Sequence, residues 1–349
     1  MGKKAVSYLL YIFTIVFTAG LLVMAVLSWR ATFVSPLLDG LWTTVALLMP
    51  VILFANVVAA IWWLVRRKWL VAVMPVAALL INMNYIAASI RLPDPDGDHH
   101  PKCGLRVATL NVDGFRRYQQ RTTSTYGMSD LIEQEDVDVF CMQEFLDDNV
   151  VTGDSIAAYF TARMPYFVRE KGEAIVSVFP ILNHGYVGFP GTNNDYLWGD
   201  LLVGKDTVRV ITIHLQTTGI STLQDLYWRA YRRKMPFLMM FPEVARNTKL
   251  RMPQVDEICN LVDTTHYPVI VVGDCNDTPS SYTYRRMTER LVDGFLTCGH
   301  GYGATFRGVG GFLRIDYIFH SKELECAHYY LPDKDVSDHK TVIADLKFK

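Results

Sequence analysis

The sequence predicts a layered α/β sandwich preceded by three transmembrane helices. Three segments within the first 90 residues, 5–29, 41–65 and 69–90, contain no Asp, Glu, Lys or Arg. Over the rest of the 349-residue chain, apolar β-branched runs alternate with helical stretches, as in folds whose helices cover packed sheets. A chain of this length has room for about two domains.

Each apolar segment is long enough to cross a membrane, because a hydrocarbon core of roughly 30 Å needs about 20 helical residues. A cleaved signal peptide is the alternative for the first segment. Its apolar run is longer than such a peptide needs, however, and no small-residue cleavage pattern follows. Pro50, Asn56, Asn82 and Asn84 lie within the spans. Packing between helices explains them better than a transport path does.

Basic residues orient the spans. Lys3 and Lys4 precede the first span, residues 66–68 form a fully basic turn between the second and third, and Arg30 is the basic residue of the remaining loop. The positive-inside rule therefore places the N-terminus and the 66–68 turn in the cytoplasm. Three crossings then put everything after residue 90 in the periplasm or outside the cell.

The part of the chain after residue 90 is acidic. Residues 1–90 hold six of the 34 Lys and Arg residues and one of the 35 Asp and Glu residues, which leaves 28 bases against 34 acids. Such a domain is a poor general binder of nucleic acid, since phosphate contacts need a basic surface. The spacing of the six cysteines predicts no particular bridge. Cys141 and Cys275, within apolar runs, are expected to be buried thiols.

Composition divides the chain into an anchor at 1–90, a linker at 91–103 and a main domain at 104–349. The linker contains three prolines and one glycine, which disfavour helix and sheet, so a solvated tether is expected. Its Asp-His-His run at 98–100 fits a solvated linker better than a metal site.

The main domain is predicted to alternate strands and helices. Several strands are apolar on both faces, which indicates that they lie between other layers. Strands are expected at 105–112, 137–142, 174–179, 197–203, 208–215, 269–272, 314–319 and 341–348. Helices are expected at 129–135, 154–164, part of 222–235, 243–262 and 282–290.

Polar motifs follow the ends of these strands. A strand holds its last side chain rigidly, so side chains from distant positions can converge there. Phosphoester hydrolysis needs neutralisation of charge on phosphoryl oxygens, an activated water and help for the departing oxygen, which carboxylates, amides and imidazoles supply. The motifs are Asn111-Val112-Asp113-Gly114, Gln143-Glu144, Gly273-Asp274-Cys275-Asn276-Asp277 and Ser337-Asp338-His339.

The residue types already indicate roles. Glu144 and Asp113 are candidate Mg²⁺ ligands, because Mg²⁺ takes hard oxygen ligands and usually one or two carboxylates. Asp274 and Asn276 are two residues apart after a strand, so their side chains point the same way. A carboxylate there can orient a water, and an amide can donate to a phosphoryl oxygen. A Gln-Glu pair alone is also common at solvent-exposed strand ends.

Two imidazoles complete the set. His339 follows Asp338, and Asp316, in Arg314-Ile315-Asp316-Tyr317, is an acid that could hold the His339 ring in one tautomer. His214 ends the strand expected at 208–215. Isolated strand histidines are more often structural than catalytic, so His214 is the weaker candidate.

In their order along the chain, these motifs resemble the signature of the endonuclease/exonuclease/phosphatase superfamily. The resemblance covers residues 105–348 and excludes the membrane segments. It implies a four-layer α/β/β/α sandwich of the deoxyribonuclease I type, with the active site across the tops of two sheets, so that 104–349 would be a catalytic domain. Cys275 departs from the bulky apolar residue usual at that position.

The resemblance also implies a metal site. Glu144 would be the principal Mg²⁺ ligand, with Asn111 and Asp113 beside it, and Mn²⁺ is the alternative ion. Asp338 would support the metal or the imidazole.

For catalysis, the resemblance implies that Asp274 and Asn276 position water and phosphate, alongside Asn111. His339, paired with Asp316, would be a general base or a transition-state stabiliser. His214 would contact the phosphoryl group or the leaving group.

One further segment bears on the substrate. Residues 227–242 combine four bases with an apolar run at 235–241. On a domain close to a bilayer, this run could rest among lipid headgroups. A helix and loop that cap the core account for it slightly better.

Three functional hypotheses follow. The leading one is a membrane-anchored, divalent-metal-dependent phosphoesterase that hydrolyses phosphodiester or phosphomonoester bonds outside the cytoplasm, in a lipid headgroup, phosphosugar or nucleotide-like substrate. The second is a membrane-bound extracytoplasmic nuclease, favoured by Asp113 and by Arg116, Arg117 and Arg121 but opposed by net charge. The third is a catalytically silent binding module, opposed by the complete set of candidate residues. No obligate protein partner is evident.

Overall fold

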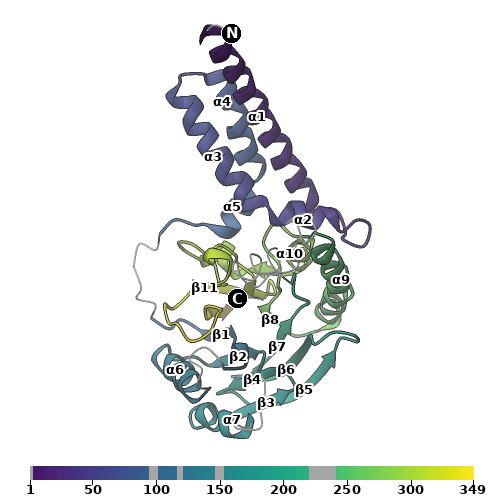
Figure 1. Ribbon diagram of the computed structural model, residues 1–349. Helices are drawn as coiled ribbons and strands as arrows, with labels where there is room; N and C mark the ends of the chain where they lie inside the picture. The colour runs from purple at the N-terminus through teal and green to yellow at the C-terminus, as the bar shows by residue number, and fades with distance from the viewer. Residues whose placement is uncertain (1–2, 94–100, 116–120, 146–152, 220–240) are drawn as a thin grey trace.

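Two six-stranded sheets pack face to face below a bundle of helices in the computed structural model (Figure 1). The strand order is β11-β12-β1-β2-β4-β3 in the first sheet and β5-β6-β7-β8-β10-β9 in the second. The structure describes residues 3–93, 101–115, 121–145, 153–219 and 241–349.

Each strand expected from the sequence overlaps an observed one. The first sheet contains β1 (Leu105–Asn111), β2 (Val139–Gln143), β3 (Tyr166–Glu170), β4 (Glu173–Ser177), β11 (Leu324–Tyr330) and β12 (Val342–Phe348). The second contains β5 (Ile181–Gly188), β6 (Asp195–Val203), β7 (Asp206–His214), β8 (Val269–Asp274), β9 (Val292–Asp293) and β10 (Asp316–His320).

Four strands were not expected: β3, β5, β9 and β11. β3 and β5 are edge strands with mostly exposed or half-buried residues, so they lack the continuous apolar run that marks the central strands. β9 has only two residues, and β11 is interrupted by a bulge between Cys326 and His328. Apolar pattern therefore identifies the centre of each sheet better than its edges.

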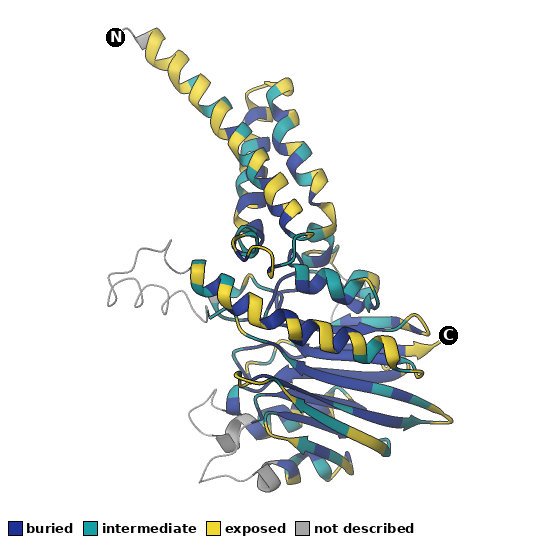
Figure 2. Ribbon diagram, turned by 90° about the vertical axis from the view of Figure 1, so that its right-hand side faces the viewer, coloured by how far each residue is buried: buried dark blue, intermediate teal, exposed yellow. Residues whose placement is uncertain are grey.

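Three apolar layers hold the sandwich together. In β1, Val107 packs between the two sheets, whereas the next residue, Ala108, faces the helices. Helices α6 (Arg121–Gln134) and α7 (Gly153–Thr161) cover the outer face of the first sheet. Helices α9 (Phe241–Thr264) and α10 (Tyr282–Thr288) cover the second. Figure 2 shows the buried sheets and the exposed stripe of α9, and the result is a four-layer α/β/β/α sandwich.

The three expected transmembrane helices are not three continuous helices in the structure. Helix α1 (Lys3–Ala31) is continuous, but α2 (Leu41–Leu47) and α3 (Met49–Val65) meet at 48°, and α4 (Trp69–Ile81) and α5 (Met83–Ser89) meet at 60°. Among the described residues, α1 is the one helix that is long and apolar enough to cross a membrane by itself. The others qualify only if each bent pair forms one span.

A proline and an asparagine lie at the two breaks, and two asparagines join the helices. Pro50 lies in the first turn of α3, where its fixed φ and missing N–H start a new helix. Asn82 sits at the second break and donates to the carbonyl of Ala25 in α1 at 3.3 Å. Asn56 donates to the carbonyl of Leu21 at 3.4 Å. The expectation that these residues pack helices together agrees with these contacts.

The anchor and the sandwich share a buried interface. Arg314, 2% exposed, donates to the carbonyl of Ala88 in α5 at 2.8 Å and pairs with Asp293 through two nitrogens at 2.7 and 2.5 Å. The Ser280 hydroxyl donates to the carbonyl of Ala46 in α2 at 2.8 Å. Both contacts end on anchor backbone, so they depend on helices α2 and α5 being folded and in place.

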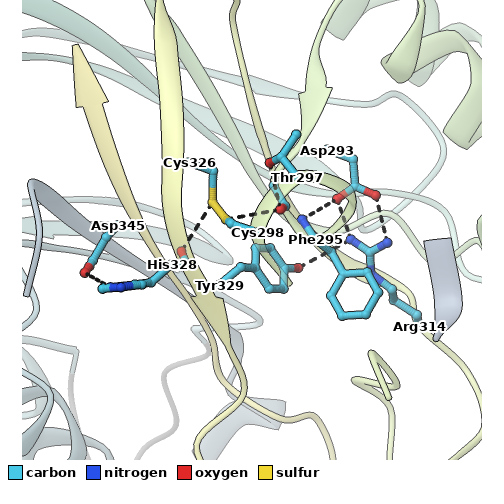
Figure 3. The surroundings of a disulfide bond; sticks show 10 residues. Asp293, Phe295, Thr297, Cys298, Arg314, Cys326, His328, Tyr329 and Asp345 are labelled. Atoms are coloured by element: carbon cyan, nitrogen blue, oxygen red, sulfur yellow. Dashed lines mark hydrogen bonds and ion pairs between the residues drawn. A yellow bond between two sulfur atoms is a disulfide. The ribbon is translucent and has the colours of Figure 1, made fainter. Parts of the chain in front are cut away.

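A disulfide lies close to the Arg314 pair. Cys298, at the end of α11 (Gly294–Cys298), is bonded to Cys326 of β11, beside Phe295 and Tyr329 (Figure 3). The spacing of the cysteines along the chain does not predict this disulfide. Cys141 and Cys275 are buried and free, as expected.

Both described ends of the expected 91–103 tether are attached to the sandwich. The Arg91 amide donates to the carbonyl of Gly301 at 2.8 Å, and Lys102 pairs with Asp138 at 2.6 Å. The tether expectation is therefore wrong at these ends, because the sandwich offers partners to both the backbone and the Lys102 charge. The predictions on residues 94–100, 116–117, 222–235 and 235–241 fall outside the described residues.

We expect Arg314→Met to lower the free energy of unfolding by about 3–5 kcal/mol, because it leaves Asp293 buried without its cation. Adding Asp293→Asn should restore part of the loss, since an amide costs less to bury than an unpaired carboxylate. Thermal unfolding followed by tryptophan fluorescence, in detergent, measures both variants. An unchanged midpoint for Arg314→Met would show that the ion pair is not required.

Candidate active site

Several strand ends meet at one edge of the sandwich. β7 and β8 are parallel and place His214 opposite Asp274, and β10 runs antiparallel to β8 and begins at Asp316, also opposite Asp274. In the other sheet, the parallel strands β1 and β2 place Asn111 opposite Gln143. Strand register therefore brings these side chains to a common edge, where open α/β sheets usually bind ligands.

His339 is held by Asp316. Its Nδ1 lies 2.9 and 3.1 Å from the two Asp316 oxygens, and its Nε2 lies 3.9 Å from Asp274. Burial alone would lower the pKa of His339, but the charge and hydrogen bond of Asp316 outweigh it and raise that pKa to about 10. The ring is therefore oriented through Nδ1, and Nε2 faces the remaining groups.

Asp274 is 2% exposed and carries a hydrogen-bond shell of its own. It accepts from the Asn276 backbone amide at 2.7 Å and from the Asn111 side chain at 3.2 Å. Burial, followed by the charge of Asp316, raises the pKa of Asp274 to about 6. The protein groups around Asp274 therefore compensate only part of the negative charge on its carboxylate.

Glu144 follows β2 and reaches the same space. Asn111 donates to its Oε1 at 3.0 Å, and His214 Nε2 lies 3.6 Å from that oxygen. Glu144 has a φ of 54° and Asn276 a φ of 51°, a left-handed conformation that non-glycine residues rarely adopt. Such strain tends to occur at functional sites, where the surrounding structure holds it in place.

The cavity at this edge has a volume of about 1360 Å³. Asn111 and Asp316, 1% exposed each, lie beneath its wall and contact Glu144, Asp274 and His339. The expected site residues that line it are Glu144, His214, Asp274, Asn276, Asp338 and His339.

Two expected residues are placed differently. Asp113 is not among the residues that line the cavity, and its backbone amide donates to Asn111 Oδ1 at 3.1 Å. The side-chain amide of Asn276 donates to the carbonyl of Leu215 at 2.9 Å and to Asp274 at 3.2 Å. This amide therefore holds Asp274 in place, whereas the sequence analysis expected it to face a phosphoryl oxygen.

A polar clamp beneath the site joins the two sheets. Gln143 donates to Thr109 of β1 at 3.0 Å and to Thr212 of β7 at 2.7 Å, and Thr212 in turn donates to Glu173 at 2.5 Å. In the sequence, Gln143 stands out only as the neighbour of Glu144. The clamp depends on contacts between two sheets, which spacing along the chain does not reveal.

Glu173 was not expected to belong to the site. It is fully buried, and its Oε1 has no hydrogen-bond partner in the described part of the chain. Burial, followed by the charge of Asp195, raises the pKa of Glu173 well above its usual range. A glutamate directly before the apolar run Ala174-Ile175-Val176 was the available signal.

The donor set fits a divalent cation. Asp274, Asp316 and His339 each offer one ligand atom, and these atoms lie within 4.8 Å of one another. Glu144 and Asp338 add carboxylates that face the same cavity. Hard oxygen donors in excess of basic groups are typical of sites for Mg²⁺ or Mn²⁺.

Two family models match parts of the chain. The family model described as the endonuclease/exonuclease/phosphatase family matches residues 108–339, and a second model, for a domain of unknown function, matches residues 7–89. No curated protein matches the chain.

Solved structures show the same fold. An endonuclease/exonuclease/phosphatase family protein from Leptotrichia buccalis has a TM-score of 0.52 at 13% identity, covering 70% of this chain and 100% of the other. One from Beutenbergia cavernae has 0.52 at 17%, covering 70% and 71%. One from Bacteroides vulgatus has 0.51 at 17%, covering 71% and 100%.

The chain belongs to the endonuclease/exonuclease/phosphatase family. The expected deoxyribonuclease I-like sandwich is confirmed. Members of this family hydrolyse phosphoester bonds and generally use a divalent metal, and the buried Asp274, Asp316 and His339 cluster provides candidate ligands for one.

We expect Glu173→Gln to stabilise the protein. The folded state keeps a proton on Glu173 at pH values where the unfolded chain, with a pKa near 4.5, has lost it, so Glu173 lowers stability as pH rises. The variant should be equal to the wild type at pH 4 and more stable at pH 8, by about 1–3 kcal/mol.

Unfolding temperatures at pH 4 and pH 8 test this expectation. Glu170→Gln, at the exposed last residue of β3, is the matched control and should change neither value. A constant difference between Glu173→Gln and the wild type across this pH range would contradict the protonation argument.

Proposed function

We propose that the chain is a membrane-anchored, divalent-metal-dependent phosphoesterase whose catalytic domain lies outside the cytoplasm. One observation carries the proposal: Glu144, Asp274, His214 and the Asp316-oriented His339 share a single cavity. The acidic balance of residues 91–349 favours small or lipid phosphoesters over nucleic acid as substrates.

A bound divalent cation would neutralise charge on the phosphoryl oxygens and lower the pKa of a bound water. Glu144 would be its main ligand, since its carboxylate reaches the cavity with 32% of the side chain exposed. Asn111 would fix the orientation of that carboxylate through its 3.0 Å hydrogen bond. Asp338, which lines the same cavity, would contribute a further oxygen. Asp113 would act through Asn111, because it lies outside the cavity lining.

The other side chains around the phosphate would each have a separate role in catalysis. Asp274, held by Asn276, would orient the attacking water and accept its hydrogen bond. His339, fixed through Nδ1 by Asp316 and kept protonated by its raised pKa, would present its Nε2–H to the phosphoryl group as a charge stabiliser. His214, with Nε2 3.6 Å from Glu144, would donate to a phosphoryl or departing oxygen.

The membrane topology is also part of the proposal. Three crossings, by α1 and the two bent pairs, would place the N-terminus and the basic 66–68 turn in the cytoplasm. In the structure, both lie at the end of the bundle remote from the sandwich (Figure 1). The Cys298–Cys326 disulfide supports an oxidising compartment for the sandwich.

We expect Glu144→Gln and His339→Ala to lower kcat/KM by about 100-fold or more, since each removes a group that would act on the transition state. The full-length protein in detergent is given p-nitrophenyl phosphate and bis-p-nitrophenyl phosphate with MgCl₂, MnCl₂ or EDTA. Chelator should abolish turnover by the wild type.

Metal binding can be measured separately from turnover, through the unfolding temperature. Mg²⁺ should raise the unfolding temperature of the wild type but not of Glu144→Gln. Asp206→Asn, at the exposed first residue of β7, is the control and should behave as wild type. Full metal-dependent turnover by Glu144→Gln would refute the proposed ligand.

We expect an alkaline phosphatase fused after Lys349 to be active, because this reporter needs an oxidising compartment. A green fluorescent protein inserted after Lys68 should fluoresce, because that turn faces the cytoplasm. The reverse pattern would overturn the topology. Thiol alkylation with and without reduction then tests whether Cys298 and Cys326 are bonded in the purified protein.

A further inference from the structure

The wall of the catalytic cavity is built partly by the anchor. Leu47, the last residue of α2, lines the cavity together with residues of the sandwich. Its neighbour Ala46 accepts the 2.8 Å hydrogen bond from Ser280, which belongs to the loop that follows Asp277. One side of the cavity is therefore formed by the membrane part of the chain.

Close packing fixes the anchor in this position. Gly40, just before α2, lies so near α9 that a Cβ built there would be 2.7 Å from the Cβ of Ala245. The guanidinium of Arg285 in α10 lies 4.4 Å from the ring centre of Phe33, in the loop after α1. Together with the hydrogen bond from Ser280 to Ala46, these two contacts hold the end of the anchor against α9, α10 and the loop beside the cavity.

The end of the cavity nearest the anchor is apolar. Leu313 and Ile315 precede β10, Phe306 packs against the His339 ring at 4.9 Å, and Leu250 projects from α9 with 46% of its surface exposed. Together with Leu47, these side chains give the cavity an apolar lining in addition to its phosphate-handling groups.

The cavity becomes polar away from the anchor. Strand order in the second sheet runs β10-β8-β7-β6-β5, so the lining passes from Ile315 to Asp274, His214, Asp195 and Tyr186 in turn. Asn193 and Asn194, with Arg169 of β3 and Lys171 of the β3–β4 turn, complete this distant end. The site for the phosphoester therefore lies between an apolar end and a polar end.

The anchor also indicates where the bilayer surface lies. The loop between α1 and α2, at the junction with the sandwich, exposes Leu37 at 55% and Leu38 at 82%, and Leu41 follows at 58% (Figure 1). Apolar side chains exposed at the end of a spanning helix are suited to the headgroup and upper acyl region. The apolar end of the cavity is thus the end adjacent to lipid.

Resting on the proposed phosphoesterase function, we propose that the substrate is a phospholipid of the leaflet next to the sandwich. Its acyl end lies along Leu47, Leu250 and Leu313, its phosphoester lies over Asp274, His214 and His339, and its headgroup extends toward Asn194 and Lys171. The volume of about 1360 Å³ exceeds what a small phosphate ester fills and accommodates such an extended amphiphile.

Hydrolysis needs no further reactant. Water attacks the phosphorus, one phosphorus–oxygen ester bond breaks, and the departing oxygen takes a proton, so that the lipid phosphodiester becomes a phosphomonoester and an alcohol. The geometry leaves the choice between the glycerol-side and headgroup-side bonds to the product analysis.

The test uses the full-length protein reconstituted with Mg²⁺ in vesicles of phosphatidylcholine, phosphatidylethanolamine, phosphatidylglycerol and phosphatidylinositol. Lipid turnover is followed by phosphorus NMR and mass spectrometry, and bis-p-nitrophenyl phosphate is the water-soluble comparison. We expect at least one lipid to be hydrolysed with a kcat/KM more than about tenfold above that of the soluble ester.

Variants of the apolar wall separate lipid recognition from chemistry. Leu250→Glu, at a half-exposed position that tolerates a charge, should lower the ratio of lipid to soluble-ester turnover about tenfold or more, and Leu47→Glu should do the same. Leu182→Glu, on the exposed edge strand β5 and outside the cavity lining, should leave this ratio unchanged.

Each outcome is decisive. Hydrolysis of the soluble ester without turnover of any vesicle lipid overturns the lipid assignment and leaves the phosphoesterase proposal intact. An equal fall of both activities in Leu250→Glu and Leu47→Glu overturns the proposed orientation. Absence of both activities refutes the phosphoesterase function and this inference with it.

Discussion

The register of three adjacent strands is the constraint on which the site depends. β7, β8 and β10 place His214, Asp274 and Asp316 in one row, and a slip of a single residue would send the side chains of a strand to the opposite face. Gly273 helps to enforce this register. It has a φ of 123°, and a Cβ there would lie 2.3 Å from the carbonyl oxygen of Ile213, so no other residue allows this approach of β8 to β7.

Beneath that row, buried polar groups connect the two sheets. The Gln143 amide bonds Thr109 and Thr212, so the sheet that carries Glu144 and the sheet that carries Asp274 cannot shift independently. The same region contains unfavourable features, including Glu173 with an unpartnered oxygen. Burying carboxylates side by side costs stability, whereas it concentrates negative charge where a cation would be held. These buried carboxylates therefore lower the stability of the fold and strengthen the negative potential of the site.

The sequence predicted the features that depend on a pattern of neighbouring residues. The central strands, with both faces buried, show continuous apolar runs, and the motifs at their ends identified Glu144, Asp274, His214 and His339, which line one cavity. Other features depend on partners far along the chain. Gln143, Glu173 and the Arg314–Asp293 pair act through contacts between sheets or between domains. The helix breaks near Pro50 and Asn82 show that apolar composition predicts helices without determining whether they are straight.

The Arg314 contact links the anchor to the assembly of the site. Arg314 lies two residues before Asp316, and one of its buried hydrogen bonds ends on the carbonyl of Ala88. Because the anchor is synthesised first, this carbonyl is in place long before β10 leaves the ribosome. The last strands of the sandwich therefore close onto helices that are already in place, and correct folding of the first ninety residues becomes a condition for completing the candidate site.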